Sequence, residues 1–419
     1  MSMTISQQII AEHCGKHSIE AGELIEAPVD LILGNDLTAP VAIHEFEKIE
    51  NAKVQNPDKV VIVMDHFTPN KDVKSAEQCC VCRNFAKKQG IKALYDVGKV
   101  GIEHVLLPEQ GFINSGDLVI GADSHTCTYG ALGAFATGIG STDMAAAMLR
   151  GKLWFQVPRG IKIVFQGKKK KWVSGKDIIL YILRKIGTNG ADYRSLEFTG
   201  DIHELTMDDR LTICNMAVEA GAKNGIFPVD QITAEYLQAA GAECRKVYEE
   251  APDEAYEKII PIDLEEIEPI VAFPSSPDQG RFFSEFGDIY LDQIVIGSCT
   301  NGRLSDLEQA ADILRGRKVA DGVRVIIIPA TVRILQEAIK KGYIAEFIEA
   351  GCAVMTPCCG PCIGGGMGIL AKGERALITT NRNFRGRMGH VESELYLCSP
   401  AVAAASAVTG KITHPEEII

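Results

Sequence analysis

The sequence lacks several features that would mark particular classes of protein. It contains no apolar run of about 18 residues, the length a membrane-spanning helix needs. Its first residues, MSMTISQQIIAEHCGKHS, have neither the basic segment nor the apolar run of a secretory leader. Basic residues are not in excess: 43 lysines and arginines stand against 55 acidic residues, which argues against a nucleic-acid binder. We therefore expect a cytoplasmic protein with no membrane or nucleic-acid partner.

The glycine patterns of the common nucleotide-binding sites are also missing. No Walker A motif is present, and Gly138-x-Gly140 is not followed by a third glycine at the dinucleotide spacing. We interpret this glycine pair as a closely packed turn that enters a helix over STDMAAAML.

Cysteine, in contrast, is plentiful. The count of 13 is odd and no secretory leader precedes it, so we do not expect a disulfide framework. Cys79, Cys80 and Cys82 fall in a helical pattern, KSAEQCCVCRNFAKK, and we interpret them as part of a helix face. The densest group is GCAVMTPCCGPCIGGG at 351–366, a segment that is rich in glycine and contains four cysteines.

Apolar runs of four to eight residues alternate with helical patterns along the chain. This alternation predicts an α/β protein with buried, mainly parallel sheets. Four of the runs end in polar residues: VVIVMDH, LVIGADSH, IVIGSCTN and ALITTNRN. Because open α/β sheets build sites at the carboxyl ends of their strands, we expect these four ends to form a shared active site. The acidic, proline-rich stretch 248–280 predicts a connection between an N-terminal and a C-terminal unit.

The cysteines leave more than one kind of metal site open. Cys359-x-x-Cys362 supplies two thiols, and Cys299 supplies a third at a strand end. A structural zinc ion would take four ligands, and a redox pair would need no third thiolate. Three thiolates can hold three irons of a [4Fe–4S] cluster and leave the fourth iron open for Lewis-acid chemistry. The residues alone favour the cluster and keep zinc as an alternative.

Five motifs become specific when they are taken together and in order: GADSHTCTYGALG, CNMAVEAGA, IGSCTNGRLSDL, CCGPCIGGG and NRNFRGR. With them the chain resembles the aconitase superfamily over nearly its whole length. Within that superfamily it is similar to the large subunits of the 3-isopropylmalate dehydratase and homoaconitase group. The resemblance implies three α/β/α domains of the aconitase type around a shared cluster site, without a C-terminal swivel domain. Two intertwined domains would occupy 1–285, and the third would occupy 286–419.

The resemblance also implies roles for individual residues. The ligands of a [4Fe–4S] cluster with one iron not ligated by protein would be Cys299, Cys359 and Cys362. His66 would be the acid, oriented by Asp65, within a catalytic group of Asp65, His66, His104, Asp123, His125 and Glu219. Substrate contacts would come from Asn35, Ser124, Asn215, Asn381, Arg382 and Arg387, of which the arginines can clamp carboxylates. Since Asn215 and Glu219 are four residues apart, we expect them on one face of a helix.

The implied activity is that of a hydro-lyase that isomerises a malate-type hydroxy acid by removing and re-adding water. Isopropylmalate, in leucine biosynthesis, is the first expectation; homoaconitase and a 2,3-dimethylmalate or citraconate-type hydratase are alternatives. Asn35 stands where fused aconitases have glutamine, which weakens citrate as the substrate. A separate small subunit, equivalent to the swivel domain, would supply the serine base and a further arginine. The non-enzymatic alternatives are a metal-binding scaffold and an RNA-binding regulator of the apo-aconitase kind.

Overall fold

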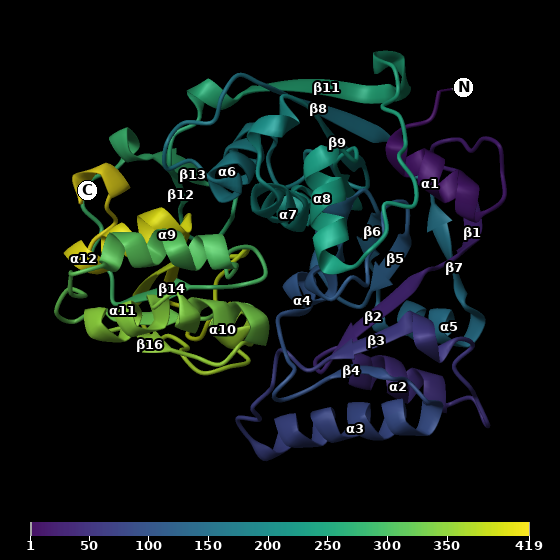
Figure 1. Cartoon of the computed structure of the whole chain (residues 1–419), viewed down its shortest axis with the longest axis horizontal. Helices are drawn as coiled ribbons and strands as arrows, with labels where there is room; N and C mark the ends of the chain where they lie inside the picture. The colour runs from purple at the N-terminus through teal and green to yellow at the C-terminus, as the bar shows by residue number, and fades with distance from the viewer. Residues whose placement is uncertain (1, 419) are drawn as a thin grey trace. The chain divides into compact units, whose positions relative to one another are not determined.

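The computed structural model describes residues 2–418 and divides them into two compact units (Figure 1). Unit 1 is formed by 2–97, 106–167 and 189–263, and unit 2 by 98–105, 168–188 and 264–418. Each unit is therefore assembled from stretches that are distant in the sequence. The predicted boundary near residue 285, and the division of 1–285 into two domains, stay predictions.

Unit 1 contains two fully parallel sheets and an antiparallel ribbon. One sheet has five strands in the order β4-β3-β2-β5-β6, and the other has four in the order β10-β9-β8-β11. β1 and β7 form the ribbon. The strand bounds are β1 Leu24–Pro28, β2 Leu31–Asn35, β3 Val60–Val63, β4 Ala93–Tyr95, β5 Leu118–Gly121, β6 Phe135–Gly138, β7 Lys152–Gln156, β8 Gly160–Gln166, β9 Ser195–Gly200, β10 Asn224–Ile226 and β11 Tyr256–Asp263.

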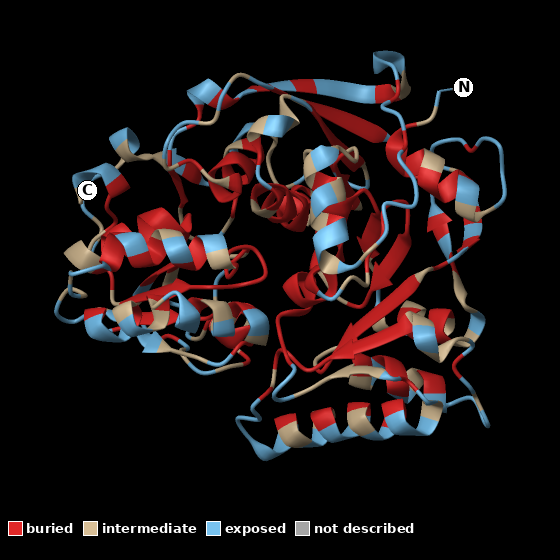
Figure 2. Cartoon of the chain, viewed as in Figure 1, coloured by how far each residue is buried: buried red, intermediate tan, exposed pale blue. Residues whose placement is uncertain are grey.

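The helices of unit 1 bury one side against the core, and several begin at a polar N-cap residue or end at a glycine. They are α1 Ile5–His13, α2 Ala39–Glu47, α3 Val73–Gln89, α5 Ser141–Arg150, α7 Met207–Asn215 and α8 Gln231–Ala240. In α3 the Asp72 side chain accepts from Ser75 N, and Gly90 ends the helix at φ 75°. Figure 2 shows the buried side of α3, which includes Cys79 and Cys82. The predicted helix is thus confirmed, and burial raises the pKa of Cys79 to about 11, so that it is a packing residue.

Unit 2 is built on one mixed sheet of seven strands, in the order β13-β12-β18-β17-β14-β15-β16. The five strands from β18 to β16 pair in parallel, while β12 pairs antiparallel with both of its neighbours. The strand bounds are β12 Ile270–Ala272, β13 Gly280–Phe282, β14 Gln293–Ile296, β15 Arg324–Ile327, β16 Ala353–Val354, β17 Arg375–Ile378 and β18 Glu394–Leu397. The helices are α6 Gly175–Ile186, α9 Leu304–Leu314, α10 Val332–Lys340, α11 Tyr343–Ala350 and α12 Pro400–Thr409, and α4 Glu103–Glu109 carries the chain from unit 2 into unit 1.

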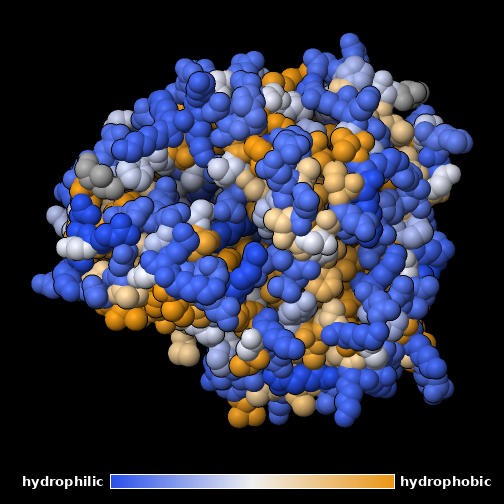
Figure 3. Space-filling view, in the orientation of Figure 1, coloured by the Kyte–Doolittle hydropathy of each residue, from blue (hydrophilic) through white to orange (hydrophobic). Residues whose placement is uncertain are grey.

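The strands β3, β5, β14 and β17 coincide with the four predicted apolar runs. Apart from the exposed first residue of β17, Arg375, their residues are buried, as expected for parallel strands covered on both faces. Each unit has its own apolar cluster, which includes Ile62 and Phe135 in unit 1 and Ile296 and Leu377 in unit 2. On the face drawn in Figure 3, hydrophilic residues predominate and hydrophobic ones form small separate groups. Within 2–418 no helix has the length and apolar character needed to cross a membrane.

Candidate active site

The carboxyl edge of the five-stranded sheet brings together the first predicted catalytic pair. β3 ends at Val63, and Asp65 and His66 follow in the turn. His66 Nδ1 lies 2.7 Å from Asp65 Oδ1 and 3.6 Å from Asp36 Oδ1, and both carboxylates are fully buried. Burial alone would lower the pKa of His66, but the two carboxylates raise it well above its ordinary value. The two carboxylates therefore favour the protonated form of the His66 ring.

Asp36 is a site residue that the sequence analysis missed. It follows β2, the neighbour of β3, and its two carboxylate oxygens accept from His66 N at 2.9 Å and from Phe67 N at 2.7 Å. Its carboxylate thus fixes the backbone of the turn that carries His66. The signal was present in the sequence, since Asp36 stands directly after the apolar run LILGN.

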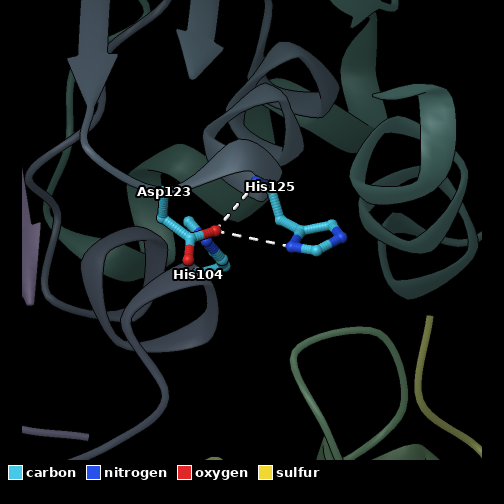
Figure 4. Close-up of side chains that lie close together, drawn as sticks. All are labelled: His104, Asp123 and His125. Atoms are coloured by element: carbon cyan, nitrogen blue, oxygen red, sulfur yellow. Dashed lines mark hydrogen bonds and ion pairs between the residues drawn. The ribbon is translucent and has the colours of Figure 1, made fainter. Parts of the chain in front are cut away.

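A second polar chain starts at the end of β5, on the other side of β2. Asp123 caps the 3-10 helix η2, Ser124–Leu132, by accepting from His125 N at 2.8 Å, and its Oδ1 lies 3.4 Å from His125 Nδ1. His125 Nε2 lies 3.0 Å from Glu219 Oε1. Figure 4 draws the two contacts between Asp123 and His125. The imidazole is thus held between two carboxylates, an arrangement suited to moving a proton.

His104 is drawn in the same view (Figure 4), and it belongs to α4. It is buried, and its Nε2 lies 3.6 Å from Oε1 of the preceding residue, Glu103. Its predicted catalytic role stays a prediction.

We had expected Asn215 and Glu219 on one α-helix, but the structure places them in two consecutive elements. α7 ends at Asn215, and Met216–Ala220 form the 3-10 helix η4. The expectation of a common face by four-residue spacing is therefore wrong in its geometry. Both side chains nevertheless contact η2: Asn215 Nδ2 donates to Thr128 Oγ1 at 2.8 Å, while Glu219 contacts His125.

Ser124 and Asn35 occupy different surroundings. Ser124 lines a cavity of about 500 Å³ in unit 1, together with Trp154, Tyr193 and Lys223. Asn35, at the end of β2, uses its side-chain oxygen locally, to accept from the backbone of residues 37 and 38 and from Thr38 Oγ1. A substrate contact by Asn35 stays a prediction.

In unit 2 the predicted cluster cysteines lie at the carboxyl edge of the seven-stranded sheet. Cys299 follows β14, while Cys359 and Cys362 lie at the 3-10 helix η8, Gly360–Ile363; the three are 6%, 8% and 3% exposed. Asn381 follows β17, the neighbour of β14, and connects the two segments. Its Nδ2 donates to Cys299 Sγ at 3.1 Å, and its Oδ1 lies 3.9 Å from Cys362 Sγ.

The glycines of the cysteine loop are required by close backbone contacts. Gly360 has φ 61°, and a Cβ on Gly366 would lie 2.4 Å from the carbonyl oxygen of Gly360. Gly297, at the start of the Cys299 turn, has φ 129°, and a Cβ there would lie 2.1 Å from the oxygen of Ile328. Only glycine fits these positions, so the backbone can wrap tightly around the buried thiols.

Among the described residues, the three cysteines do not form a compact site for a single ion. Within 2–418, the groups of three or more ligand atoms that lie within 4.8 Å of one another contain only histidines and carboxylates, and no cysteine. A zinc ion needs its ligand atoms that close, whereas the thiolates of a cluster bind different irons and stand farther apart. Three buried thiols from two segments, cradled by glycines, therefore fit an iron–sulfur cluster.

Cationic and amide groups border the cysteine loop. Arg387 Nε donates to the carbonyl of Cys362 at 2.9 Å, so at least part of this guanidinium supports the loop. Arg382 is partly buried beside Asn381, while Arg385 is exposed. The roles of Arg382 and Arg387 as carboxylate clamps stay predictions.

Lys176 is a second residue that the sequence analysis missed. It is fully buried in the first turn of α6, and burial lowers its pKa to about 8. Its Nζ donates to Thr300 Oγ1, beside Cys299, and to the carbonyls of Thr379 and Thr380, beside Asn381. The one available signal was a lysine at the start of a helix, where the macrodipole disfavours a cation.

Comparisons with known proteins agree with this arrangement. The model of the aconitase family (aconitate hydratase) matches residues 7–288 and 283–410. Curated proteins named 3-isopropylmalate dehydratase large subunit are 60% identical in Clostridioides difficile strain 630 and 61% identical in Clostridium kluyveri, over 100% of each chain. The crystal structure of Thermococcus kodakaraensis aconitase X (holo-form) matches with a TM-score of 0.51 at 14% identity, covering 94% of this chain and 97% of the other. The last match concerns the fold alone.

Proposed function

Because the chain belongs to the aconitase family, we propose that it is the large, cluster-binding subunit of a hydro-lyase, a 3-isopropylmalate dehydratase. The family and the dehydratase relatives imply an iron–sulfur cluster, and the buried Cys299, Cys359 and Cys362 fit it. The observation that carries the proposal is the side chain of Asn381, which connects the sulfurs of the two cysteine segments at the edge of one sheet. The expected reaction interconverts 2-isopropylmalate and 3-isopropylmalate by loss and return of water.

The proposed cluster is [4Fe–4S], with three irons bound by the three cysteines and the fourth not ligated by protein. When bound, it supplies a Lewis acid that polarises the bond between carbon and the departing hydroxyl. The remaining tasks fall to side chains of this chain.

Proton transfer to the departing hydroxyl is assigned to His66. Its Nδ1 is engaged by Asp65, so the charged ring donates from Nε2. The carboxylates of Asp65 and Asp36 raise the pKa of His66 and so favour the protonated ring that this role requires. His125, between Asp123 and Glu219, and His104 complete the polar network that we assign to the movement of water and protons.

Binding of the diacid is assigned to the remaining polar groups. Arg382 and Arg387 pair with carboxylates, Ser124 and Asn35 donate hydrogen bonds, and Asn215 and Asn381 orient the neighbouring groups. The base that removes the carbon-bound proton is not among the residues assigned here. We propose that a serine of a separate small subunit, equivalent to the swivel domain of fused aconitases, supplies it together with a further arginine. The printed name "large subunit" of the relatives supports such a partner.

The test is to co-express the chain with its small subunit and to reconstitute the pair anaerobically with iron and sulfide. Hydration is then measured on a panel of unsaturated diacids that carry isopropyl, carboxyethyl, carboxymethyl or methyl groups. We expect turnover with the isopropyl compound and very little with the large chain alone. Full activity of the chain alone would contradict the two-subunit proposal, and preference for another side group would reassign the substrate.

A further inference from the structure

Lys176 is the one fully buried lysine among the described residues, and its surroundings are unusual for a buried cation. Its three donor contacts, to Thr300 Oγ1 at 3.0 Å, Thr379 O at 2.9 Å and Thr380 O at 2.7 Å, go to uncharged oxygens. An ammonium has three N–H donors, so these acceptors satisfy it completely, whereas a neutral amine has only two. The contacts therefore fit the charged form.

No carboxylate within 2–418 lies at ion-pair distance from this ammonium. The adjacent Asp177 is occupied elsewhere: its oxygens accept from Ser174 and from the backbone N–H of Ile270. A buried cation without an ion-pair partner is costly, and Cys299 stands directly before Thr300, whose hydroxyl accepts from this ammonium. The structure thus places an unpaired cation where a cluster would carry negative charge.

The acceptors of Lys176 belong to two turns that carry parts of the cluster site. Thr300 follows Cys299 after β14, and Thr379 and Thr380 precede Asn381 after β17. The same turns are joined by further hydrogen bonds, from Thr300 Oγ1 to Thr379 O and from Gly297 N to Thr379 Oγ1. Lys176 therefore fastens together the segments that hold the Cys299 sulfur and the Asn381 amide.

We propose that Lys176 is a positioning residue of the cluster site: it ties the Cys299 turn to the Asn381 turn and holds a fixed positive charge beside the cluster. This inference rests on the proposed cluster and adds a role for a residue of α6. The charge stabilises the more negative, reduced form of the cluster and raises its reduction potential. The tie also restrains the turn that carries Cys299, and this restraint should slow the release of iron from the cluster.

The two effects can be separated by variants of the full-length chain, reconstituted anaerobically. Lys176→Gln removes the charge but keeps N–H donors. Thr300→Val keeps the charge and removes two contacts of the tie, the one from Lys176 Nζ to Thr300 Oγ1 and the one from Thr300 Oγ1 to Thr379 O. The matched control is Lys162→Gln, since Lys162 is also buried but is paired with Asp253 and Glu250 in unit 1. The measurements are the midpoint potential of the cluster, by EPR-monitored titration, and the rate at which iron is released in air.

We expect Lys176→Gln to shift the potential to a more negative value and to speed iron release. Thr300→Val should speed iron release by about 30-fold, the equivalent of two hydrogen bonds, without moving the potential. Lys162→Gln should match wild type in both.

An unchanged potential in folded Lys176→Gln would overturn the role of the charge. If Lys176→Gln does not fold, the test rests on Thr300→Val. A rate of iron release equal to that of wild type in this variant would contradict the role of the tie and overturn the inference. A wild-type chain that takes up no cluster would instead contradict the proposed function itself.

Discussion

The two units neutralise buried charge in different ways. In unit 1 the histidines of the site contact carboxylates: His66 contacts Asp65 and Asp36, and His125 contacts Asp123 and Glu219. In unit 2 the ammonium of Lys176 donates only to hydroxyl and carbonyl oxygens.

This difference indicates a division of labour. Buried charge pairs are complete without a ligand, so the groups of unit 1 are set in advance for proton transfer. A buried cation with neutral partners favours the arrival of anions, and both a thiolate-bound cluster and a diacid are anionic. Variants at the histidine–carboxylate pairs of unit 1 should therefore change proton transfer. Variants at the cysteines and arginines of unit 2 should change cluster binding and the binding of substrate carboxylates.

The largest expected effect is the loss of the cluster from unit 2. Cys359→Ala should abolish cluster assembly, because it removes one of the three proposed thiolates. The adjacent Cys358→Ala is the matched control, since Cys358 is equally buried but is not assigned as a ligand, and it should retain the cluster. Iron and sulfide analysis with the visible absorption spectrum measures both. Equal cluster contents in the two variants would overturn the ligand assignment.

The next largest effect is a loss of proton transfer in unit 1, with cluster binding in unit 2 unchanged. His66→Gln should lower kcat of the two-subunit enzyme by about 10²- to 10⁴-fold, the usual contribution of a general acid, with the cluster content unchanged. His13→Gln is the control, because His13 also pairs with a carboxylate, that of Asp30, at 2.7 Å. Its kcat should stay near the wild-type value. A His66 variant that loses its cluster would show that the two units are not functionally separable.

A smaller effect sharpens the account of substrate binding in unit 2. Arg382→Gln should raise KM about 10- to 100-fold, since it removes a charged hydrogen-bond donor to a carboxylate. The exposed Arg385→Gln should change KM by no more than about twofold, as is usual for a surface residue. Steady-state kinetics on the isopropyl substrate provide the comparison. Equal KM values in the two variants would remove Arg382 from the binding site.

The parts of this picture that the sequence predicts are those encoded locally. The run VVIVMDH predicts a buried strand that ends in Asp65 and His66, because β-branched residues fill a parallel strand and polar ones cannot continue it. The break between α7 and η4 at Asn215 was not predicted, since the four-residue spacing of Asn215 and Glu219 is also compatible with one helix. Nor was Lys176, whose acceptors lie more than a hundred residues away and meet it only through the order of strands in the sheet.

The smallest expected effect concerns the stability of the charge pair in unit 1. Asp65→Asn should lower the free energy of unfolding by on the order of 2 kcal/mol at low pH, because His66 loses a charged hydrogen-bond partner. A raised pKa in the folded state stabilises the protein fully below the ordinary histidine pKa, about 6.5, and this contribution is lost as pH rises through the folded value. The deficit of Asp65→Asn relative to wild type should therefore be largest near pH 6 and shrink towards alkaline pH.

Urea unfolding of both proteins at pH 6 and at pH 9 measures this deficit, and subtracting the two curves cancels the groups that titrate equally in both. His13→Gln, measured in the same way, reports what a partly exposed histidine–carboxylate pair contributes. We expect its deficit to be the smaller of the two, because solvent screens His13 and Asp30 more than the buried His66 and Asp65. A deficit of Asp65→Asn that grows with pH would mean that His66 is neutral in the folded protein, and the acid would then have to be sought at His125.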